Sequence, residues 1–160
     1  MNMTNNYTQL PAFELTGVHC RTTNEQEAGP EGKLGALWQR YFESGLSAAP
    51  GIRNPQFLYG LYTDYETDAS GAYTALIGHE LGAGEIREGL ATAAVPAAKY
   101  KIFTTQRGPV QQVVAQKWQE IWRYFGQSSE ERTYTGDFER YDLVKFDPAD
   151  AVVEIFVAVK

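Results

Sequence analysis

Two stretches of the chain carry hydrophobic side chains at the spacing of an amphipathic helix. In the first, apolar residues recur at i, i+3, i+4, i+7 and i+8, which is the stripe that one helix face buries. These residues are Leu34, Leu37, Trp38, Tyr41 and Phe42. The second stripe consists of Val110, Val113, Val114, Trp118, Ile121, Trp122 and Phe125. Pro30 and Pro109 precede the two stripes, where a first helical turn needs no amide donor. We therefore expect two long helices.

Around these helices the chain alternates apolar and polar residues or gathers aromatic and β-branched ones, as strands do. The expected strands are 13–21, 57–64, 72–81, 94–105, 137–144 and 151–159. Pro96 lacks an amide donor and is tolerated only at an edge or a bulge. The order strand, helix, strand, strand thus occurs twice, and it predicts an α+β fold. We expect tandem duplicated βαββ units that form one antiparallel sheet with both long helices on one face.

Short sequence elements repeat between the two halves at a nearly constant offset of 79 or 80 residues. The repeated elements are Gly29-Pro30 with Gly108-Pro109, Trp38-Gln39 with Trp118-Gln119, and 59–62 (Tyr-Gly-Leu-Tyr) with 138–141 (Phe-Glu-Arg-Tyr). At one position the copies differ by a charge, since Gly60 of the first half corresponds to Glu139 of the second. A duplicated fold tends to form a cleft at the seam between its halves, so this mismatch indicates a pocket.

The length of the chain favours one domain over two. Two separate domains of about 80 residues would each have a marginal hydrophobic core. We therefore expect a single domain over 1–160, with interlocked halves at about 10–84 and 90–160. The uncharged polar start of the chain, 1–8, is expected to be a flexible tail.

The candidate site follows from strand geometry. Alternate side chains of a strand share one face, so Glu139 and Tyr141 point the same way. The repeat gives Gly60 and Tyr62 the equivalent places in the first half, and the two repeated tryptophans are placed to flank the same groove. The expected ligand-binding residues are therefore Glu139, Tyr141, Tyr62, Gly60, Trp38 and Trp118.

An acid among aromatic rings suits a flat, hydrophobic cation. Aromatic faces attract cations by about 0.5–2 kcal/mol per good contact, and a buried carboxylate without a partner is costly. Burial should raise the pKa of Glu139, so protonation should weaken cation binding. Two simpler alternatives stay open: a surface glutamate that is solvated or paired with Arg132 or Arg140, and tryptophans that only fill the core.

Composition excludes several classes of partner. The net charge is −6 and no basic run is present, so direct nucleic-acid binding is disfavoured. No stretch approaches the roughly 20 apolar residues that cross a bilayer. Cys20 is the single cysteine, which rules out an internal disulfide and is consistent with a cytoplasmic location. His19 and His79 lack metal-binding spacing, and we expect no metal, no cofactor and no catalytic residue.

The chain resembles the GyrI-like effector-binding domains of AraC-type and MerR-type multidrug regulators. The resemblance spans about 13–159 and is carried by Leu37-Trp38, 59–62, 137–141 (Asp-Phe-Glu-Arg-Tyr) and a preceding Arg132-Thr133-Tyr134. It implies a tandem βαββ fold with a groove between the halves, where an acidic residue, matched here by Glu139, contacts cationic lipophilic ligands. Regulators carry a helix-turn-helix domain before this module, whereas little precedes Phe13 here. The chain is thus similar to standalone drug-binding proteins of integron gene cassettes.

The expected function is therefore capture of cationic, lipophilic aromatic compounds without enzymatic turnover. Two alternatives follow from the same resemblance. One is a hydrolase of cyclopropane-containing genotoxins, with Glu139 as base and Tyr141 as proton donor. The other is a protein-interaction inhibitor of the DNA gyrase type. A separate DNA-binding protein or a second copy of the chain also stays open as a partner.

Overall fold

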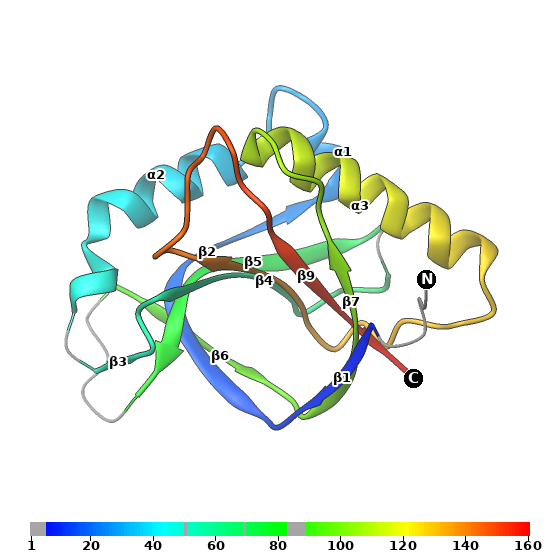
Figure 1. Cartoon of the computed structure of the whole chain (residues 1–160), viewed down its shortest axis with the longest axis horizontal. Coiled ribbons are helices and arrows are strands. Elements are labelled where there is room, and N and C mark those ends of the chain that lie inside the picture. Colours follow the sequence, from blue (N-terminus) through cyan, green and yellow to red (C-terminus); the bar gives the residue numbers. More distant parts are fainter. Residues whose placement is uncertain (1–5, 50, 69, 83–88) are drawn as a thin grey trace.

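The computed structural model describes residues 6–49, 51–68, 70–82 and 89–160. Its strands and helices follow the chain in a simple order (Figure 1). The first half contains β1 (Tyr7–Leu10), β2 (Phe13–Thr23), α1 (Asn24–Glu27), α2 (Leu34–Ser44), the 3-10 turn η1 (Leu46–Ala48), β3 (Ile52–Arg53), β4 (Phe57–Thr63) and β5 (Ala72–Leu81). The second half contains β6 (Ala91–Val95), β7 (Ala98–Thr104), α3 (Val110–Gln127), β8 (Asp137–Asp142) and β9 (Glu154–Val159).

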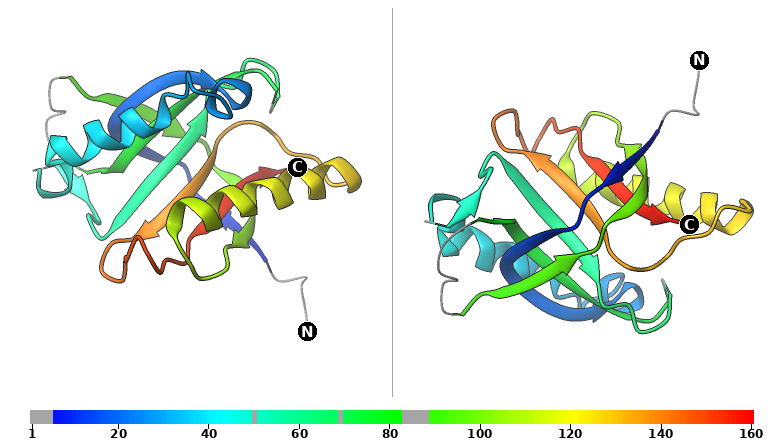
Figure 2. Two further views of the ribbon diagram at one scale, coloured as in Figure 1. Left: turned by 90° about the horizontal axis from the view of Figure 1, so that it is seen from above. Right: turned by 90° about the horizontal axis from the view of Figure 1, so that it is seen from below.

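One antiparallel sheet connects the two halves. Its strand order is β1-β7-β9-β8-β4-β5-β2-β6, and β3 pairs with β5. The series β2, α2, β4, β5 recurs as β7, α3, β8, β9, and the two series meet where β4 pairs with β8. Seen from above, α2 and α3 both lie on the viewer's side of the sheet, with β4 and β8 running between them (Figure 2). The junction strands therefore form a floor between two helical walls.

The α+β class and the single antiparallel sheet are confirmed, but the expectation of two long helices is wrong. Only α3 is long, at 18 residues, whereas α2 has 11. Gly45 adopts the left-handed conformation with φ of 66° directly after α2, which is a common way for a helix to end. The apolar stripe of α2 extends only from Leu34 to Phe42, so the helix covers one part of the sheet and then stops.

The strand that we expected at 94–105 is split into β6 and β7. Pro96 and Ala97 separate the two strands. Because proline lacks the amide that a sheet ladder requires, pairing stops there. On one side of the break β6 pairs with β2, and on the other side β7 pairs with β1 and β9. The break is thus the point where the chain crosses from the first half of the sheet to the second.

The expected flexible tail at 1–8 is too long by at least two residues. Tyr7 and Thr8 belong to β1, which pairs with β7. The hydroxyl of Tyr7 donates to Glu130 at 3.0 Å, and the ammonium of Lys101 lies 4.5 Å from its ring centroid. These contacts hold the strand on the sheet. Residues 1–5, and 83–88 of the boundary between the halves, lie outside the described residues.

The sheet buries hydrophobic side chains on both faces, and α2 and α3 cover only one of them. On the covered face, Leu37 and Tyr41 of α2 pack in one cluster, and Ile121 of α3 packs against Ile155 and Val157 of β9. On the opposite face the core consists of Leu15, Tyr59, Leu61, Leu76, Val95, Tyr100, Phe138, Phe156 and Ala158. Since neighbouring residues of a strand point to opposite faces, Phe138 fills the second core while Glu139 faces the helices.

A glycine pair permits close approach of β2 and β5. Gly17 and Gly78 are register partners, and a Cβ on either would lie within 2.0 Å of a backbone oxygen of the other strand. No other residue fits at either position without moving the strand.

Candidate functional site

A cavity of about 760 Å³ lies between α2 and α3 above the β4–β8 junction. Its walls are mostly aromatic. Trp38 and Phe42 from α2 line one wall, and Trp118 and Trp122 from α3 line the other. The two outer residues are exposed, Phe42 by 66% and Trp122 by 41%. The cavity therefore opens between the helices, with aromatic rings from its mouth inward.

Glu139 brings a negative charge to the floor of this cavity. It lies on β8 directly opposite Gly60 of β4 and is 2% exposed. Three neutral groups donate hydrogen bonds to its carboxylate. The hydroxyl of Tyr62 and the indole Nε1 of Trp118 each lie 2.7 Å from Oε2, and the hydroxyl of Tyr141 lies 2.5 Å from Oε1.

No cation accompanies this carboxylate within the part of the chain that the structure describes. None of the ion pairs there includes Glu139. The alternative pairing with Arg132 or Arg140 is wrong, because Arg132 pairs with Asp137 at 2.6 Å and Arg140 with Glu154 at 2.8 Å. Burial raises the pKa of Glu139, although the three donors pull it downward. The site thus holds a desolvated acid whose hydrogen-bond partners, among the described residues, are all neutral.

The aromatic rings next to Glu139 contact one another edge to face. Trp38 meets Tyr141 with ring centroids 5.5 Å apart, and Trp118 meets Tyr62 at 5.6 Å. Both tryptophans are half-buried and line the cavity, so they are not simply core residues. Edge-to-face contacts of this kind hold the rings in defined orientations. Five of the six expected site residues therefore meet around one cavity.

Gly60 has a different place from the other five. It does not line the cavity among the described residues, but a Cβ built on it would lie 3.3 Å from Oε1 of Glu139. The missing side chain leaves the space that the carboxylate needs. The glycine of the first half thus makes room for the glutamate of the second half, which is its partner on the neighbouring strand.

Sequence reasoning missed two further charged residues that line this cavity, Glu27 and Arg132. Arg132 lines it and pairs with Asp137, a carboxylate with no measurable exposure on β8. Asp137 also accepts from the hydroxyl of Tyr65 at 2.6 Å and from the backbone amide of Ala158 at 2.8 Å. Strand alternation alone would have found Asp137, because it lies two residues before Glu139 and shares its face.

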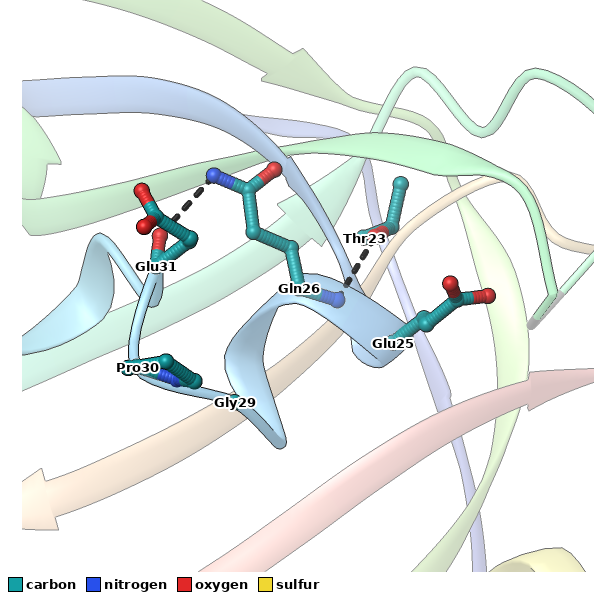
Figure 3. A pocket seen from close by; sticks show the side chains of 6 residues that line it. All are labelled: Thr23, Glu25, Gln26, Gly29, Pro30 and Glu31. Carbon is teal, nitrogen blue, oxygen red and sulfur yellow. Dashed lines mark hydrogen bonds between the residues drawn. The ribbon is translucent and has the colours of Figure 1, made fainter.

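A smaller hollow of about 470 Å³ lies beside α1 (Figure 3). Its polar groups serve the local backbone. The hydroxyl of Thr23 accepts from the amide of Gln26, and the side chain of Gln26 donates to the carbonyl oxygen of Glu31. It has no aromatic wall and no buried charge, so its residues support a turn and provide no ligand site.

The histidines and acidic side chains outside this cavity were the other candidates for a site. No group of three histidine, cysteine or acidic side chains there is placed to hold a metal. His79 is fully buried and hydrogen-bonds the hydroxyl of Tyr41 and the carbonyl oxygen of Phe57, and burial lowers its pKa.

None of the described helices is long and apolar enough to cross a membrane.

Solved structures share this fold. The integron cassette protein VCH_CASS2 of Vibrio cholerae is 35% identical, with a TM-score of 0.77 over 97% of this chain and 95% of that one. SAV2435, solved bound to tetraphenylphosphonium, is 23% identical with a TM-score of 0.75 over 96% of this chain and 92% of its own. At that identity the likeness to SAV2435 shows the fold alone.

Sequence comparison leads to the same group. YobU of Bacillus subtilis (strain 168) is 33% identical over 155 residues, covering 96% of each protein. The transcriptional regulator BrlR of Pseudomonas aeruginosa is 26% identical over 162 residues, which make up 56% of its length. The model of the Cass2 family, described as integron-associated effector binding protein, matches residues 7–159. The resemblance to effector-binding domains is therefore confirmed, and the chain belongs to the Cass2 family of integron-associated effector-binding proteins.

Proposed function

We propose that this protein binds lipophilic aromatic cations in the cavity between α2 and α3, with the positive charge near Glu139. One observation carries the proposal: a buried carboxylate at an aromatic cavity has only neutral hydrogen-bond partners among the described residues. Removing a carboxylate from water is unfavourable unless an opposite charge accompanies it. A cationic ligand supplies that charge.

The aromatic walls favour cations whose charge is spread over a large apolar surface. Rings that face the cavity gain both from apolar burial and from attraction between their π faces and a cation. Trp38, Trp118 and Tyr62 are held by edge-to-face contacts, so little ordering of side chains is needed when a ligand enters. The solved complex of SAV2435 with tetraphenylphosphonium gives this proposal a precedent on the same fold.

The hydrogen bonds of Glu139 support binding over hydrolysis. A carboxylate has about four acceptor positions on its two oxygens. Three donors already occupy three of these positions, and both tyrosine hydroxyls that might deliver a proton donate to this same group. Little acceptor capacity is left to activate water, whereas the negative charge stays available to a cation.

The test is a titration of tryptophan fluorescence with methyltriphenylphosphonium and with triphenylphosphine oxide, a neutral compound of similar size. We expect the wild-type protein to prefer the cation and Glu139→Gln to lose about 2–4 kcal/mol of that affinity, roughly 30-fold to 1,000-fold. Binding of the neutral compound should change little.

Glu80→Gln is the matched control. Glu80 is half-buried, accepts a hydrogen bond from a tyrosine, Tyr59, and lies outside the cavity. The same substitution there changes the net charge equally and should leave the cation affinity as it was. Equal cation affinities of wild type and Glu139→Gln would contradict the proposal.

A further inference from the structure

The two exposed aromatic residues of this chain both line the cavity. The ten tyrosines, eight phenylalanines and three tryptophans all lie within the described residues. Every one of them is buried or half-buried except Phe42 and Trp122, and these two belong to the cavity walls. Exposed apolar surface that gathers at one place marks a binding site. The outer part of the cavity therefore calls for an occupant that covers these two rings.

Each exposed ring continues a tryptophan of the same wall. Phe42 follows Trp38 by four residues on α2, and Trp122 follows Trp118 by four residues on α3. Residues four apart are neighbours on one face of a helix. The ring centroids are 6.0 Å apart in the first pair and 6.2 Å in the second, with interplanar angles of 30° and 34°. Each wall thus presents an inner ring and an outer ring at a small angle to one another.

The sequence repeat gives the two outer rings equivalent positions. Phe42 and Trp122 are 80 residues apart, the same offset that separates Trp38 from Trp118. Both helices lie on the same side of the sheet, with β4 and β8 between them (Figure 2), and all four rings line the same cavity. The outer rings therefore belong to opposite walls and can contact one bound group from two sides.

The outer rings retain surface for a further contact. Among the described residues, Phe42 contacts the rings of Trp38 and Tyr41, and Trp122 contacts that of Trp118. All of these neighbours belong to the same helix as the outer ring itself. The exposure of Phe42 and Trp122 shows that these contacts cover only part of each residue. An aromatic group of a ligand can therefore stack there without displacing any ring.

From this arrangement we infer that Phe42 and Trp122 form an outer subsite, which stacks on a second aromatic group of the ligand bound at Glu139. The subsite rests on the proposed function and narrows its ligand class to elongated cations with an aryl group beyond the charged centre. One helical turn separates the inner and outer positions on each wall, which a linker of roughly four carbon atoms spans. Glu139 selects the charge, and the outer rings select the second aryl group.

A small molecule fits these two residues better than a second copy of the chain does. A stable protein interface buries about 800 Å² on each partner. Among the described residues, the other exposed large hydrophobic side chains are those of Val144 and Val152, so no wide apolar face surrounds the outer rings. Two rings at the opening of a concave site are instead the setting in which small ligands bind.

The experiment compares two cations with the same charged head, butyl-triphenylphosphonium and 4-phenylbutyl-triphenylphosphonium. Isothermal titration calorimetry measures their affinities, because the signal then does not depend on the tryptophans that are replaced. The terminal phenyl group buries apolar surface and stacks on two rings. We therefore expect the wild-type protein to bind the phenylbutyl compound roughly 20-fold more tightly than the butyl compound.

The affinity ratio of the two cations is then measured in a double variant, Phe42→Ala with Trp122→Ala, and in Val144→Ala. Without the outer rings the ratio should fall to about twofold or less. Both replaced residues are exposed, so the double variant should keep its fold. Val144 is an exposed apolar residue outside the cavity lining, and its replacement should keep the wild-type ratio. A 20-fold ratio that persists in the double variant would overturn the inference.

A second measurement needs no variant. Nuclear Overhauser effects should connect the terminal phenyl protons of the bound ligand with ring protons of Phe42 and Trp122, and their absence in the saturated complex would contradict the subsite. Sedimentation that shows a wild-type dimer, lost in the double variant, would assign the rings to a contact between copies instead. Equal affinities of two cations that both depend on Glu139 would remove the outer subsite and leave cation binding intact. If neither cation binds, both proposals fail.

Discussion

Asp137 and Glu139 are two buried carboxylates on one face of β8, two residues apart, yet their surroundings differ in kind. Asp137 has an arginine at 2.6 Å together with a tyrosine hydroxyl and a backbone amide. Glu139 has two tyrosine hydroxyls and an indole, all neutral. The first charge is balanced within the described part of the protein, whereas the second is stabilised by dipoles alone.

Under the proposed function, this difference separates a charge that stabilises the fold from a charge that binds the ligand. A carboxylate with its own arginine has no use for a ligand cation, and its removal leaves an arginine buried without a partner. Neutral donors at short distance reduce the free-energy cost of burying a carboxylate. An incoming cation reduces that cost further. The two carboxylates should therefore differ in how much folding stability is lost when each is replaced by its amide.

The largest effect is expected from Asp137→Asn. Asparagine keeps the shape but removes the charge that balances Arg132, and breaking a buried ion pair from one side costs about 3–5 kcal/mol of folding free energy. Urea denaturation should show this loss in Asp137→Asn and a change below about 1 kcal/mol in Glu139→Gln. Similar losses of folding free energy in the two variants would mean that the two carboxylates contribute equally to the stability of the fold.

The pH dependence of cation binding should be the next largest effect. Burial raises the pKa of Glu139 above its ordinary value of 4.5. As the pH falls, Glu139 therefore becomes protonated while exposed carboxylates are still ionised. Below that raised pKa the affinity for methyltriphenylphosphonium should fall by about tenfold per pH unit. Bound cation lowers the pKa of Glu139, so the midpoint should move to lower pH as the ligand concentration rises. In Glu139→Gln this component of the pH dependence should be absent.

The contribution of Glu139 to the folding stability of the ligand-free protein should change with pH in the direction opposite to the cation affinity. Between pH 4.5 and the raised pKa, the folded state holds the proton of Glu139 more tightly than the unfolded state does. The contribution of Glu139 to stability therefore increases as the pH falls through the raised pKa toward 4.5. A stability difference between wild type and Glu139→Gln that does not change over this range would contradict the assigned burial effect.

The smallest effect is expected from Gly60→Ala. Its Cβ would lie 3.3 Å from Oε1 of Glu139, so the carboxylate must shift by a few tenths of an ångström. We expect a loss of cation affinity below about 1 kcal/mol, measured in the same fluorescence titration. Gly126→Ala, an exposed helix position whose added Cβ meets nothing within 4 Å, is the control. A gain in affinity in Gly60→Ala would show that the glycine is not there to make room.

Local patterns in the sequence predict much of this fold. The apolar spacing over 34–42 and 110–125 locates both helices, and strand alternation puts Glu139 and Tyr141 on one face. The constant offset between the halves aligns Gly60 with Glu139, and the structure makes them register partners. These features depend on spacing along the chain, so a single sequence contains them.

Features that depend on how the chain folds back on itself could not be predicted. Arg132 and Asp137 are near in sequence, but their ion pair requires that the loop before β8 turns back, and the sequence did not show that Arg132 and Arg140 pair with Asp137 and Glu154 and leave Glu139 without an arginine. Whether Trp38 and Trp118 fill a core or line a cavity depends on how far α2 and α3 lie apart, which sequence spacing does not determine.

The pairing of β4 with β8 also has a consequence for the order of events during synthesis. Tyr62 and Glu139 share a hydrogen bond across 77 positions of the chain, and contacts of such long range form late because a large loop must close first. While the chain emerges from the ribosome, β4 can pair with β5 long before β8 is available. Ligand affinity is thus acquired only when the second half has been made and has joined the first. A cation that binds the completed site would therefore stabilise the state in which the two halves have joined.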